Sequence, residues 1–184
     1  DIRFPVVVKA DGLAAGKGVV VAKSEDEAFE ALEAMLDKSV FGGAGHKVVI
    51  EEFLGGEEAS FICLCDGSVA IPFASSQDHK ARDDGDEGPN TGGMGAYSPA
   101  PIVSPNVHQS VMEEVILPTM EGLAADGSPY VGFLYAGLMI MPDGSPKVIE
   151  FNCRFGDPEA QPIMMRLQSD IVELCDLAMS GGCL

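Results

Sequence analysis

Polar side chains at alternate positions near the end of one apolar run offer ligands for a hard metal ion. In Glu150-Phe-Asn-Cys-Arg154, a strand would place Glu150, Asn152 and Arg154 on one face. Carboxylate and amide oxygens suit Mg²⁺, which keeps water and phosphate oxygens in its shell. An arginine just beyond them can stabilise a transferring phosphoryl group. The pattern predicts a metal-dependent phosphoryl-transfer site, with solvated surface charge as the alternative.

A glycine-rich loop near the start of the chain offers a site for phosphate. Gly12, Gly16 and Gly18 let backbone amides approach phosphate oxygens, while Lys9 and Lys17 add positive charge. The spacing is one residue short of a Walker loop, Gly18 stands where that loop has Ser or Thr, and a strand rather than a helix follows. These details favour a hairpin lid over a triphosphate. An ordinary glycine hairpin with surface lysines is the alternative.

A long polar stretch at residues 75–98 carries a third set of candidates. It contains Gly88-Pro-Asn-Thr-Gly-Gly-Met-Gly95, preceded by Gln77-Asp-His-Lys80. Consecutive backbone amides there can form an anion-binding nest, and Asp78 can hold an ammonium group. His79 has no partner that the sequence reveals, so a structural role is expected for it. A stretch this long with few apolar residues predicts a structureless loop ordered around a ligand.

A fourth candidate is the segment Glu51-Glu-Phe-Leu54, which precedes Gly55-Gly-Glu-Glu58. A strand that leaves one lobe and turns into another exposes backbone N–H and C=O groups, which can bind the edge of an adenine. A carboxylate nearby can accept hydrogen bonds from ribose hydroxyls.

The elements that must position these residues mix strand and helix patterns. Predicted strands lie at residues 5–9, 18–22, 48–53, 59–66, 69–73, 135–141 and 147–152. Helices are predicted from Ser24, where Glu27 completes a capping box, over 106–125 with a bend near Pro118, and from about Ser169. Asp66-Gly67 predicts a hairpin turn. The pattern indicates an α+β fold with a first lobe at 1–54 and a second lobe at 55–184.

Composition limits the partners of this chain. Its 184 residues carry a formal net charge of −18, which argues against nucleic acid or an anionic membrane as the main partner. No apolar run approaches the length of a membrane span, and the start does not resemble a signal peptide. Five cysteines without metal-binding spacing predict small buried side chains in a reducing, cytoplasmic location. Because the first residue is Asp1, we expect an excerpt from a longer protein.

Together these segments resemble the phosphoribosylamine–glycine ligase family of the ATP-grasp superfamily. The resemblance rests on KADGLAAGKGV, VIEEFLGGEEASF, SQDHK, GPNTGGMGAYSPAP, GFLYAGLMI and KVIEFNCRFGDPEAQ. These segments run nearly end to end in the family's order, and GPNTGGMG with RFGDPEAQ is the most specific combination. The resemblance implies an ATP-grasp fold in which two α+β lobes with mainly antiparallel sheets clamp ATP.

The resemblance also implies a reaction. ATP and Mg²⁺ or Mn²⁺ would drive the joining of glycine to 5-phosphoribosylamine through a glycyl phosphate, giving glycinamide ribonucleotide in purine biosynthesis. Family members carry further N-terminal and C-terminal domains that these residues do not include. We therefore expect the isolated chain to bind ATP–magnesium weakly and not to complete the ligation.

The family's functional residues carry over by motif. Residues assigned to ATP are Lys9, Gly12, Gly16, Lys17, Gly18, Glu51, Glu52, Phe53, Leu54 and Glu58. Residues assigned to the substrates are Asp78, Asn90, Thr91, Gly92, Gly93, Met94 and Asp157. Glu150 and Asn152 match the metal ligands, and Arg154 and Lys17 match catalytic positions. Many superfamily members have another metal carboxylate on the preceding strand, where this chain has only apolar residues.

Two other functions are consistent with parts of the sequence. One is a different ATP-grasp ligase that acts on another carboxylate, because the superfamily shares the nucleotide clamp. The other is a nucleotide-binding module without catalysis, which has little need for both metal ligands and Arg154. Replacing Glu150 with Gln would leave such a module almost unchanged and nearly abolish turnover in a ligase.

Overall fold

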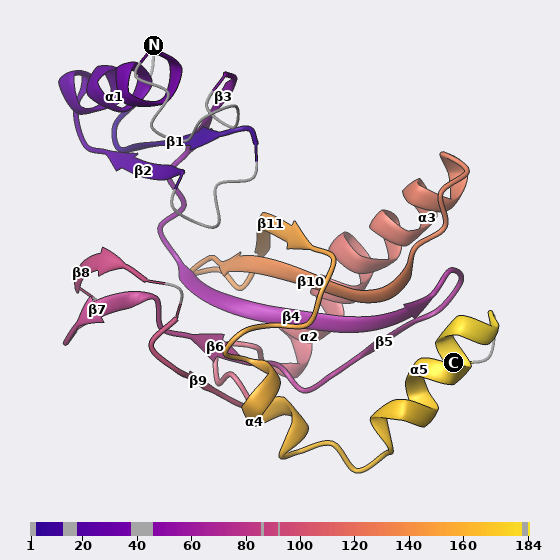
Figure 1. The fold of residues 1–184 in the computed structure, drawn as a ribbon. Coiled ribbons are helices and arrows are strands. Elements are labelled where there is room, and N and C mark those ends of the chain that lie inside the picture. Colours follow the sequence, from indigo (N-terminus) through magenta and orange to yellow (C-terminus); the bar gives the residue numbers. More distant parts are fainter. Residues whose placement is uncertain (1–2, 13–17, 38–45, 86, 92, 182–183) are drawn as a thin grey trace. The chain divides into compact units, whose positions relative to one another are not determined.

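The computed structural model describes residues 3–12, 18–37, 46–85, 87–91, 93–181 and 184 (Figure 1). The chain divides into two compact units, Asp1–Leu54 and Gly55–Leu184. In the described ranges, no helix combines the length and the apolar character needed to cross a membrane.

The first unit is a three-stranded antiparallel sheet with one helix. Its elements are β1 (Val6–Ala10), β2 (Val19–Ala22), α1 (Glu25–Leu32), a π-helical turn (Glu33–Asp37) and β3 (Val48–Glu52). The strand order is β2-β1-β3. The β-branched residues of all three strands favour this pleated arrangement. The predicted antiparallel hairpin of the first two strands is confirmed.

Helix α1 begins where the sequence predicts it. The Ser24 side chain accepts a hydrogen bond from the Glu27 backbone N–H, and the Glu27 carboxylate accepts one from the Lys23 N–H at 2.7 Å. The first bond satisfies a donor that the first helical turn leaves free, and the second ties the residue before the N-cap to the helix. The helix buries Ala31 and, through its π-helical extension, Met35 against Val8 of β1.

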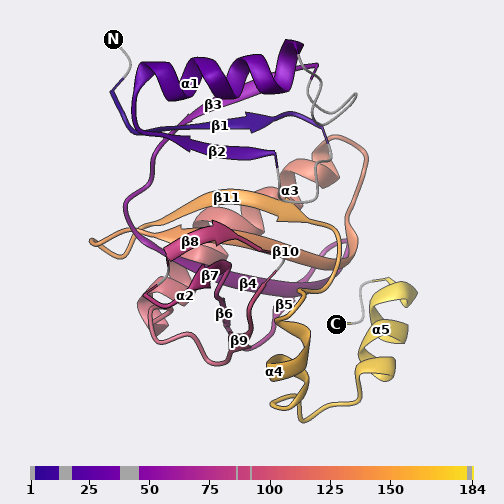
Figure 2. The same ribbon diagram turned by 60° about the vertical axis from the view of Figure 1, so that its left-hand side comes forward.

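The second unit is built on a four-stranded antiparallel sheet (Figure 2). Its strands are β4 (Glu57–Asp66), β5 (Ala70–Pro72), β10 (Val131–Ile140) and β11 (Pro146–Asn152), in the order β11-β10-β4-β5. The predicted turn between β4 and β5 is confirmed: Gly67 has a φ of 96°, and the Asp66 carboxylate accepts hydrogen bonds from the N–H groups of Ser68 and Val69.

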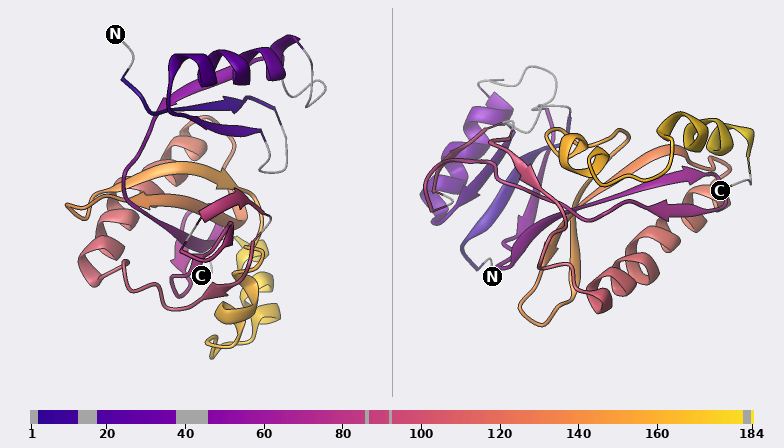
Figure 3. Two further views of the ribbon diagram at one scale, coloured as in Figure 1. Left: turned by 90° about the vertical axis from the view of Figure 1, so that its left-hand side faces the viewer. Right: turned by 90° about the horizontal axis from the view of Figure 1, so that it is seen from below.

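Helices pack on both faces of this sheet (Figure 3). On one face lie α2 (Pro105–Val111), a π-helical turn (Met112–Ile116) and α3 (Leu117–Ala125); on the other lie the short α4 (Ala160–Met164) and α5 (Ile171–Ser180). The main core fills the first face, because alternate residues of β4 such as Phe61 and Cys63 point toward α2 and α3. The π-helical turn directly precedes α3, whose Pro118 supplies no N–H, and the predicted bend near Pro118 stays a prediction.

Residues 75–98 are not the structureless loop that their composition predicts. They form two short antiparallel ladders, β6 (Gln77–Asp78) with β9 (Ala96–Tyr97), and β7 (Ala81–Asp83) with β8 (Glu87–Asn90). Further backbone bonds run from the Met94 N–H to the His79 carbonyl at 2.7 Å and from the Thr91 N–H to the Lys80 carbonyl at 2.7 Å. The prediction was wrong because these bonds order the segment with few apolar side chains.

The cysteines divide into two kinds. Cys63 and Cys65 are buried in the core, as predicted, whereas Cys153 is exposed and Cys175 is partly exposed. The prediction of a buried position is therefore wrong for Cys153, which directly follows β11, and holds only in part for Cys175. Cys183 lies outside the described residues. The reducing, cytoplasmic location stays a prediction.

Candidate functional site

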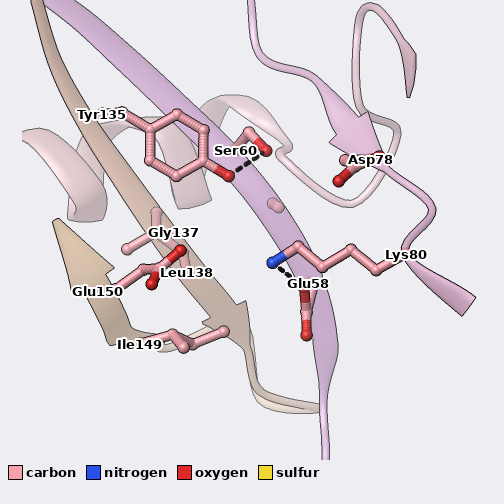
Figure 4. A pocket seen from close by; sticks show the side chains of 10 residues that line it. Glu58, Ser60, Asp78, Lys80, Tyr135, Gly137, Leu138, Ile149 and Glu150 are labelled. Atoms are coloured by element: carbon pink, nitrogen blue, oxygen red, sulfur yellow. Dashed lines mark hydrogen bonds and ion pairs between the residues drawn. The ribbon is translucent and has the colours of Figure 1, made fainter. Parts of the chain in front are cut away.

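A polar pocket lies on the second unit's sheet, on the face opposite α2 and α3. Strand register places Ser60 of β4, Gly137 of β10 and Glu150 of β11 in one row across the sheet. A Cβ atom on Gly137 would lie 3.3 Å from the Glu150 Cγ and 3.4 Å from the Tyr135 Cε1, so the missing side chain leaves the space open. The lining residues are Glu58, Ala59, Ser60, Asp78, Lys80, Tyr135, Gly137, Leu138, Ile149 and Glu150 (Figure 4).

The two predicted metal ligands lie beside each other at this pocket. Glu150 lines it, and the Asn152 Nδ2 donates a hydrogen bond to the Glu150 Oε1 at 3.3 Å. A carboxylate and an amide fit part of the oxygen shell of Mg²⁺. Among the residues that the structure describes, no group of three or more His, Cys, Asp or Glu could hold a metal. Water and phosphate oxygens would have to complete the shell.

Arg154 lies just beyond the end of β11. Its Nη1 donates to the Phe155 carbonyl at 2.8 Å, and its Cζ lies 6.0 Å from the centre of the Tyr135 ring. A guanidinium over an aromatic face is attracted by the ring's negative electrostatic potential. The structure therefore brings the predicted catalytic arginine to the tyrosine that lines the pocket.

Lys80 is a pocket residue that sequence reasoning did not assign. Its Nζ lies 3.2 Å from the Glu58 Oε2, and Figure 4 shows Lys80 and Glu150 entering the pocket from different segments. Burial lowers the pKa of Lys80, but the carboxylates around it, Glu58 first, outweigh that effect and raise the pKa overall. Lys80 therefore stays charged, and Glu58, one of the residues assigned to ATP, is its ion-pair partner.

Asp78 presents a buried acceptor to the pocket. Its Oδ1 atom is buried and has no hydrogen-bond partner among the residues that the structure describes. Burial, helped by the charge of Glu159 and opposed by Lys80, raises the pKa of Asp78 to about 6. A buried polar atom without a hydrogen bond costs free energy. The Asp78 Oδ1 is therefore suited to accept a hydrogen bond from a ligand.

Gly93 lets two of the sequence motifs meet next to Asp78. A Cβ on Gly93 would lie 2.6 Å from the Pro158 Cδ and 3.2 Å from the Asp78 Oδ1. The φ of Gly93 is 128°, which L side chains rarely adopt. The glycine-rich segment and the turn after Arg154 therefore approach as closely as they do only because residue 93 has no side chain.

Glu159 is a site residue that sequence reasoning did not assign. Asp157, a predicted substrate residue, is exposed, whereas Glu159 is only 2% exposed. Its Oε1 accepts hydrogen bonds from the Ser60 Oγ at 2.7 Å and the Tyr135 hydroxyl at 3.0 Å. The available signal was the presence of Ser60 and Tyr135 in otherwise apolar strands, since buried hydroxyls need a partner.

The other predicted substrate residues take different positions. The Thr91 Oγ1 donates to the Lys80 carbonyl at 2.9 Å and accepts from the Gly93 N–H at 3.1 Å, so it supports the backbone of its own segment. Met94 is exposed. Asn90 ends β8, and Gly92 lies outside the described residues.

The first unit carries its own set of predicted ATP residues. The Lys9 Nζ on β1 lies 2.6 Å from the Glu51 Oε2 on β3, so these two predicted residues form an ion pair. Strand register places them on the sheet face opposite Val8, which packs against α1. Val19 and Val21 of β2 share this open face and are each 45% exposed. The face therefore combines apolar surface with a lysine.

The remaining residues of that set lie at the ends of the strands. The Ala10 N–H donates to the Gly18 carbonyl at 2.8 Å and closes the base of the glycine-rich loop, next to Gly12. Phe53 is exposed, and Glu52 is exposed at the end of β3. Gly16 and Lys17 lie outside the described residues.

Comparison with known sequences places these features in one family. A family model described as the ATP-grasp (A) domain of phosphoribosylglycinamide synthetase matches residues 1–160. A relative from Allochromatium vinosum named phosphoribosylamine–glycine ligase is 68% identical over 181 residues, which is 98% of this chain and 42% of the relative. The chain therefore spans less than half the length of this relative.

Solved structures agree on the fold. The crystal structure of phosphoribosylamine–glycine ligase from Thermotoga maritima has a TM-score of 0.89 and 36% identity, covering 100% of this chain and 46% of that one. The biotin carboxylase domain of the Hydrogenobacter thermophilus 2-oxoglutarate carboxylase, solved with magnesium ADP, ADP and bicarbonate, has a TM-score of 0.74 and 19% identity, covering 100% and 38%. The second likeness concerns the fold alone. The predicted α+β, ATP-grasp fold is confirmed.

Proposed function

The chain belongs to the phosphoribosylglycinamide synthetase ATP-grasp (A) domain family, and we propose that it is the ATP-dependent part of an enzyme that joins glycine to 5-phosphoribosylamine. The product of that reaction is glycinamide ribonucleotide, a purine precursor. The observation that carries the proposal is the pocket of the second unit. Glu150 lines it with Asn152 hydrogen-bonded beside it, a pair of the type that binds a hard metal, and Asp78 adds a carboxylate suited to an ammonium group.

The proposed chemistry has two steps. The glycine carboxylate attacks the γ-phosphorus of ATP, forming glycyl phosphate and releasing ADP. The amine of phosphoribosylamine then attacks the acyl carbon, phosphate leaves, and the amine proton is lost. The first step is required because a free carboxylate is a poor electrophile. Holding the reactants in line and neutralising phosphate charge accounts for most of the rate enhancement in such transfers.

Residues of the second unit take distinct roles in this scheme. Glu150 and Asn152 would hold Mg²⁺ or Mn²⁺, which would supply positive charge against the phosphates when bound. Arg154 donates hydrogen bonds to the oxygens of the acyl-phosphate centre. The unpartnered Oδ1 of Asp78 accepts a hydrogen bond from the glycine ammonium group. Lys80, held by Glu58, adds a positive charge close to the carboxylates.

Residues of the first unit bind the nucleotide. Lys9 and Lys17 neutralise the phosphates, and the backbone amides at Gly12, Gly16 and Gly18 approach their oxygens. Adenine contacts by residues 51–54 and a ribose contact by Glu58 stay predictions, as do substrate contacts by Asn90, Thr91, Gly92, Gly93, Met94 and Asp157. The apolar open face around Val19 and Val21 supports a planar base as the ligand.

The test uses the full-length protein that contains this chain. Incubation with ATP, Mg²⁺, glycine and phosphoribosylamine should give ADP and glycinamide ribonucleotide by mass spectrometry. Parallel reactions replace glycine with alanine or bicarbonate. ADP formation that requires another carboxylate and not glycine would contradict the proposal and favour a different ATP-grasp ligase. Nucleotide binding without ADP formation under any of these conditions would favour a binding module.

A further inference from the structure

Glu159 is a carboxylate buried beside the pocket, and burying a carboxylate costs free energy. Only 2% of its surface is exposed. Transferring a carboxylate from water into the interior is unfavourable unless hydrogen bonds compensate for the lost hydration. Its Oε1 receives two such bonds, from the Ser60 and Tyr135 hydroxyls, which also lie 3.0 Å from each other. Three buried polar groups from three segments of the chain therefore form one closed network.

The backbone around Glu159 is arranged to keep its side chain in place. A Cβ on Gly156 would lie 2.5 Å from the Glu159 Oε2, so only glycine leaves room there for the carboxylate. The Glu159 carbonyl accepts a hydrogen bond from the Ile163 N–H at 3.2 Å and so leads into α4. Ile163 is itself buried against Ile62 and Tyr135. The backbone at Gly156 and at the start of α4 thus helps to fix the position of the carboxylate, in addition to its hydrogen bonds.

Tyr135 connects this network to the residues proposed for chemistry. Its hydroxyl is bound by Glu159, while its ring lies 6.0 Å from the Arg154 Cζ and borders the space that Gly137 leaves open beside Glu150. A tyrosine free to change rotamer would offer Arg154 no fixed surface. Figure 4 shows the ring beside Ser60 at the wall of the pocket.

We propose that Glu159 is a positioning residue of the ligation. By accepting hydrogen bonds from Ser60 and Tyr135, it fixes the tyrosine ring over which Arg154 lies. Glu159 itself touches no substrate. This inference rests on the proposed function, in which Arg154 faces the acyl-phosphate centre. Small displacements of Arg154 should slow the reaction strongly, since a shift of about 1 Å in a group at the reacting centre can lower a rate about 100-fold.

The test compares two replacements of Glu159 in the full-length enzyme. Glu159→Leu keeps the volume and removes the acceptor, and should lower kcat about 100-fold while the KM for ATP changes by less than about threefold. Glu159→Gln keeps an acceptor oxygen and should retain kcat within about tenfold of the wild type. Adding Tyr135→Phe to Glu159→Leu should cause little further loss, because both changes break one network. The exposed Glu121→Leu on α3 is the matched control.

Three outcomes would overturn the proposal. They are a wild-type kcat in Glu159→Leu, a loss of kcat in Glu159→Gln as large as in Glu159→Leu, or losses that merely follow the unfolded fraction seen by circular dichroism. The last outcome would show a structural role only.

A second measurement does not depend on activity. In full-length protein labelled with ¹³C at the tyrosine Cζ, the Tyr135 signal, identified by its loss in Tyr135→Phe, should move in Glu159→Leu and stay in Glu159→Gln. An unmoved signal in Glu159→Leu would contradict the positioning role even if the wild type failed to ligate glycine, whereas that failure alone would contradict the proposed function.

Discussion

The two units present their polar residues in opposite ways. In the first unit, Lys9 and Glu51 lie on neighbouring strands of an open sheet face, within 2.6 Å of each other. In the second unit, Ser60, Tyr135 and Glu159 come from distant parts of the chain and are buried. An ion pair at an open face can exchange its partner for an arriving ligand with little rearrangement. A buried network holds one geometry, which suits the placement of reacting groups.

The two units also differ in the size of their buried apolar cores. Among the described residues, the buried cluster of the first unit consists of Val8, Ala31 and Met35, whereas the second unit buries a continuous layer between its sheet and α2–α3. Segments with few buried apolar contacts open at lower free energy. The comparison indicates that the first unit, which we propose binds the nucleotide, is less stabilised by buried apolar contacts than the second unit, which carries the proposed chemistry.

The largest expected effect concerns the rigid core. Phe61 is fully buried in the second unit and packs edge-on against His108, so Phe61→Ala should lower the free energy of unfolding by about 3–5 kcal/mol. Met35→Ala should instead weaken amide-exchange protection in the first unit only. Denaturant unfolding combined with hydrogen exchange measures both. If either variant lowered amide-exchange protection equally in both units, the proposed difference in stability between the units would be contradicted.

The next effect concerns chemistry. Glu150→Gln removes a charged metal ligand and should lower kcat about 1,000-fold in the full-length enzyme. Nucleotide binding through the first unit should persist, because Lys9 and the glycine-rich loop are unchanged. Steady-state kinetics measures the loss of turnover, and calorimetric titration with ADP measures nucleotide binding. Glu121→Gln is the control. Full turnover in Glu150→Gln would remove the metal assignment.

Much of the local structure was predictable from sequence because it depends on neighbouring residues. The Ser24 cap, the Asp66-Gly67 turn and the strands with β-branched runs follow from short-range patterns, and the structure confirms them. The burial of Glu159 was not predictable in this way. It depends on Ser60, which lies 99 residues earlier in the chain, and on strand register that no local pattern specifies.

The same distinction applies to residues 75–98. Their composition resembles that of a flexible loop, and the order comes from backbone bonds between β6 and β9 and between β7 and β8. Lys80 and Asp78 reach the pocket only because these ladders form. Glu150, a predicted metal ligand, lines the pocket with Asn152 beside it, whereas the groups that surround Glu150 required the structure.

A smaller effect should appear as a pH dependence. The pKa of Asp78 is raised from 3.8 to about 6, so the folded protein holds a proton between these values that the unfolded chain releases. Folding is therefore favoured by this group at acidic pH, and that contribution is lost as the pH rises through 6. Glycine binding shows the opposite trend, because only the ionised carboxylate attracts an ammonium group. The KM for glycine should rise about tenfold per pH unit below 6.

Asp78→Asn tests the origin of that dependence. It should raise the KM for glycine at neutral pH and flatten its rise at acidic pH, measured in initial rates at saturating ATP. An unchanged acidic rise in Asp78→Asn would assign the dependence to another group.

The smallest expected effect concerns the open face of the first unit. Lys9→Met should raise the KM for ATP by about fivefold, equivalent to about 1 kcal/mol, because a partly exposed charge contributes modestly. Lys47→Met is the matched control, since Lys47 is an exposed lysine paired with Asp11 at 3.4 Å. A loss of kcat rather than a rise in KM would mean that Lys9 belongs with the rigid chemical site.

The central claim is that Glu150 and Asn152 hold the metal that the nucleotide brings. The most direct test is a crystal structure of the full-length protein with a non-hydrolysable ATP analogue and Mn²⁺, located by its anomalous scattering. We expect the Mn²⁺ peak about 2.1–2.2 Å from an oxygen of Glu150 and from the amide oxygen of Asn152, with phosphate oxygens completing the shell. A bound analogue whose Mn²⁺ touches neither residue would contradict this account.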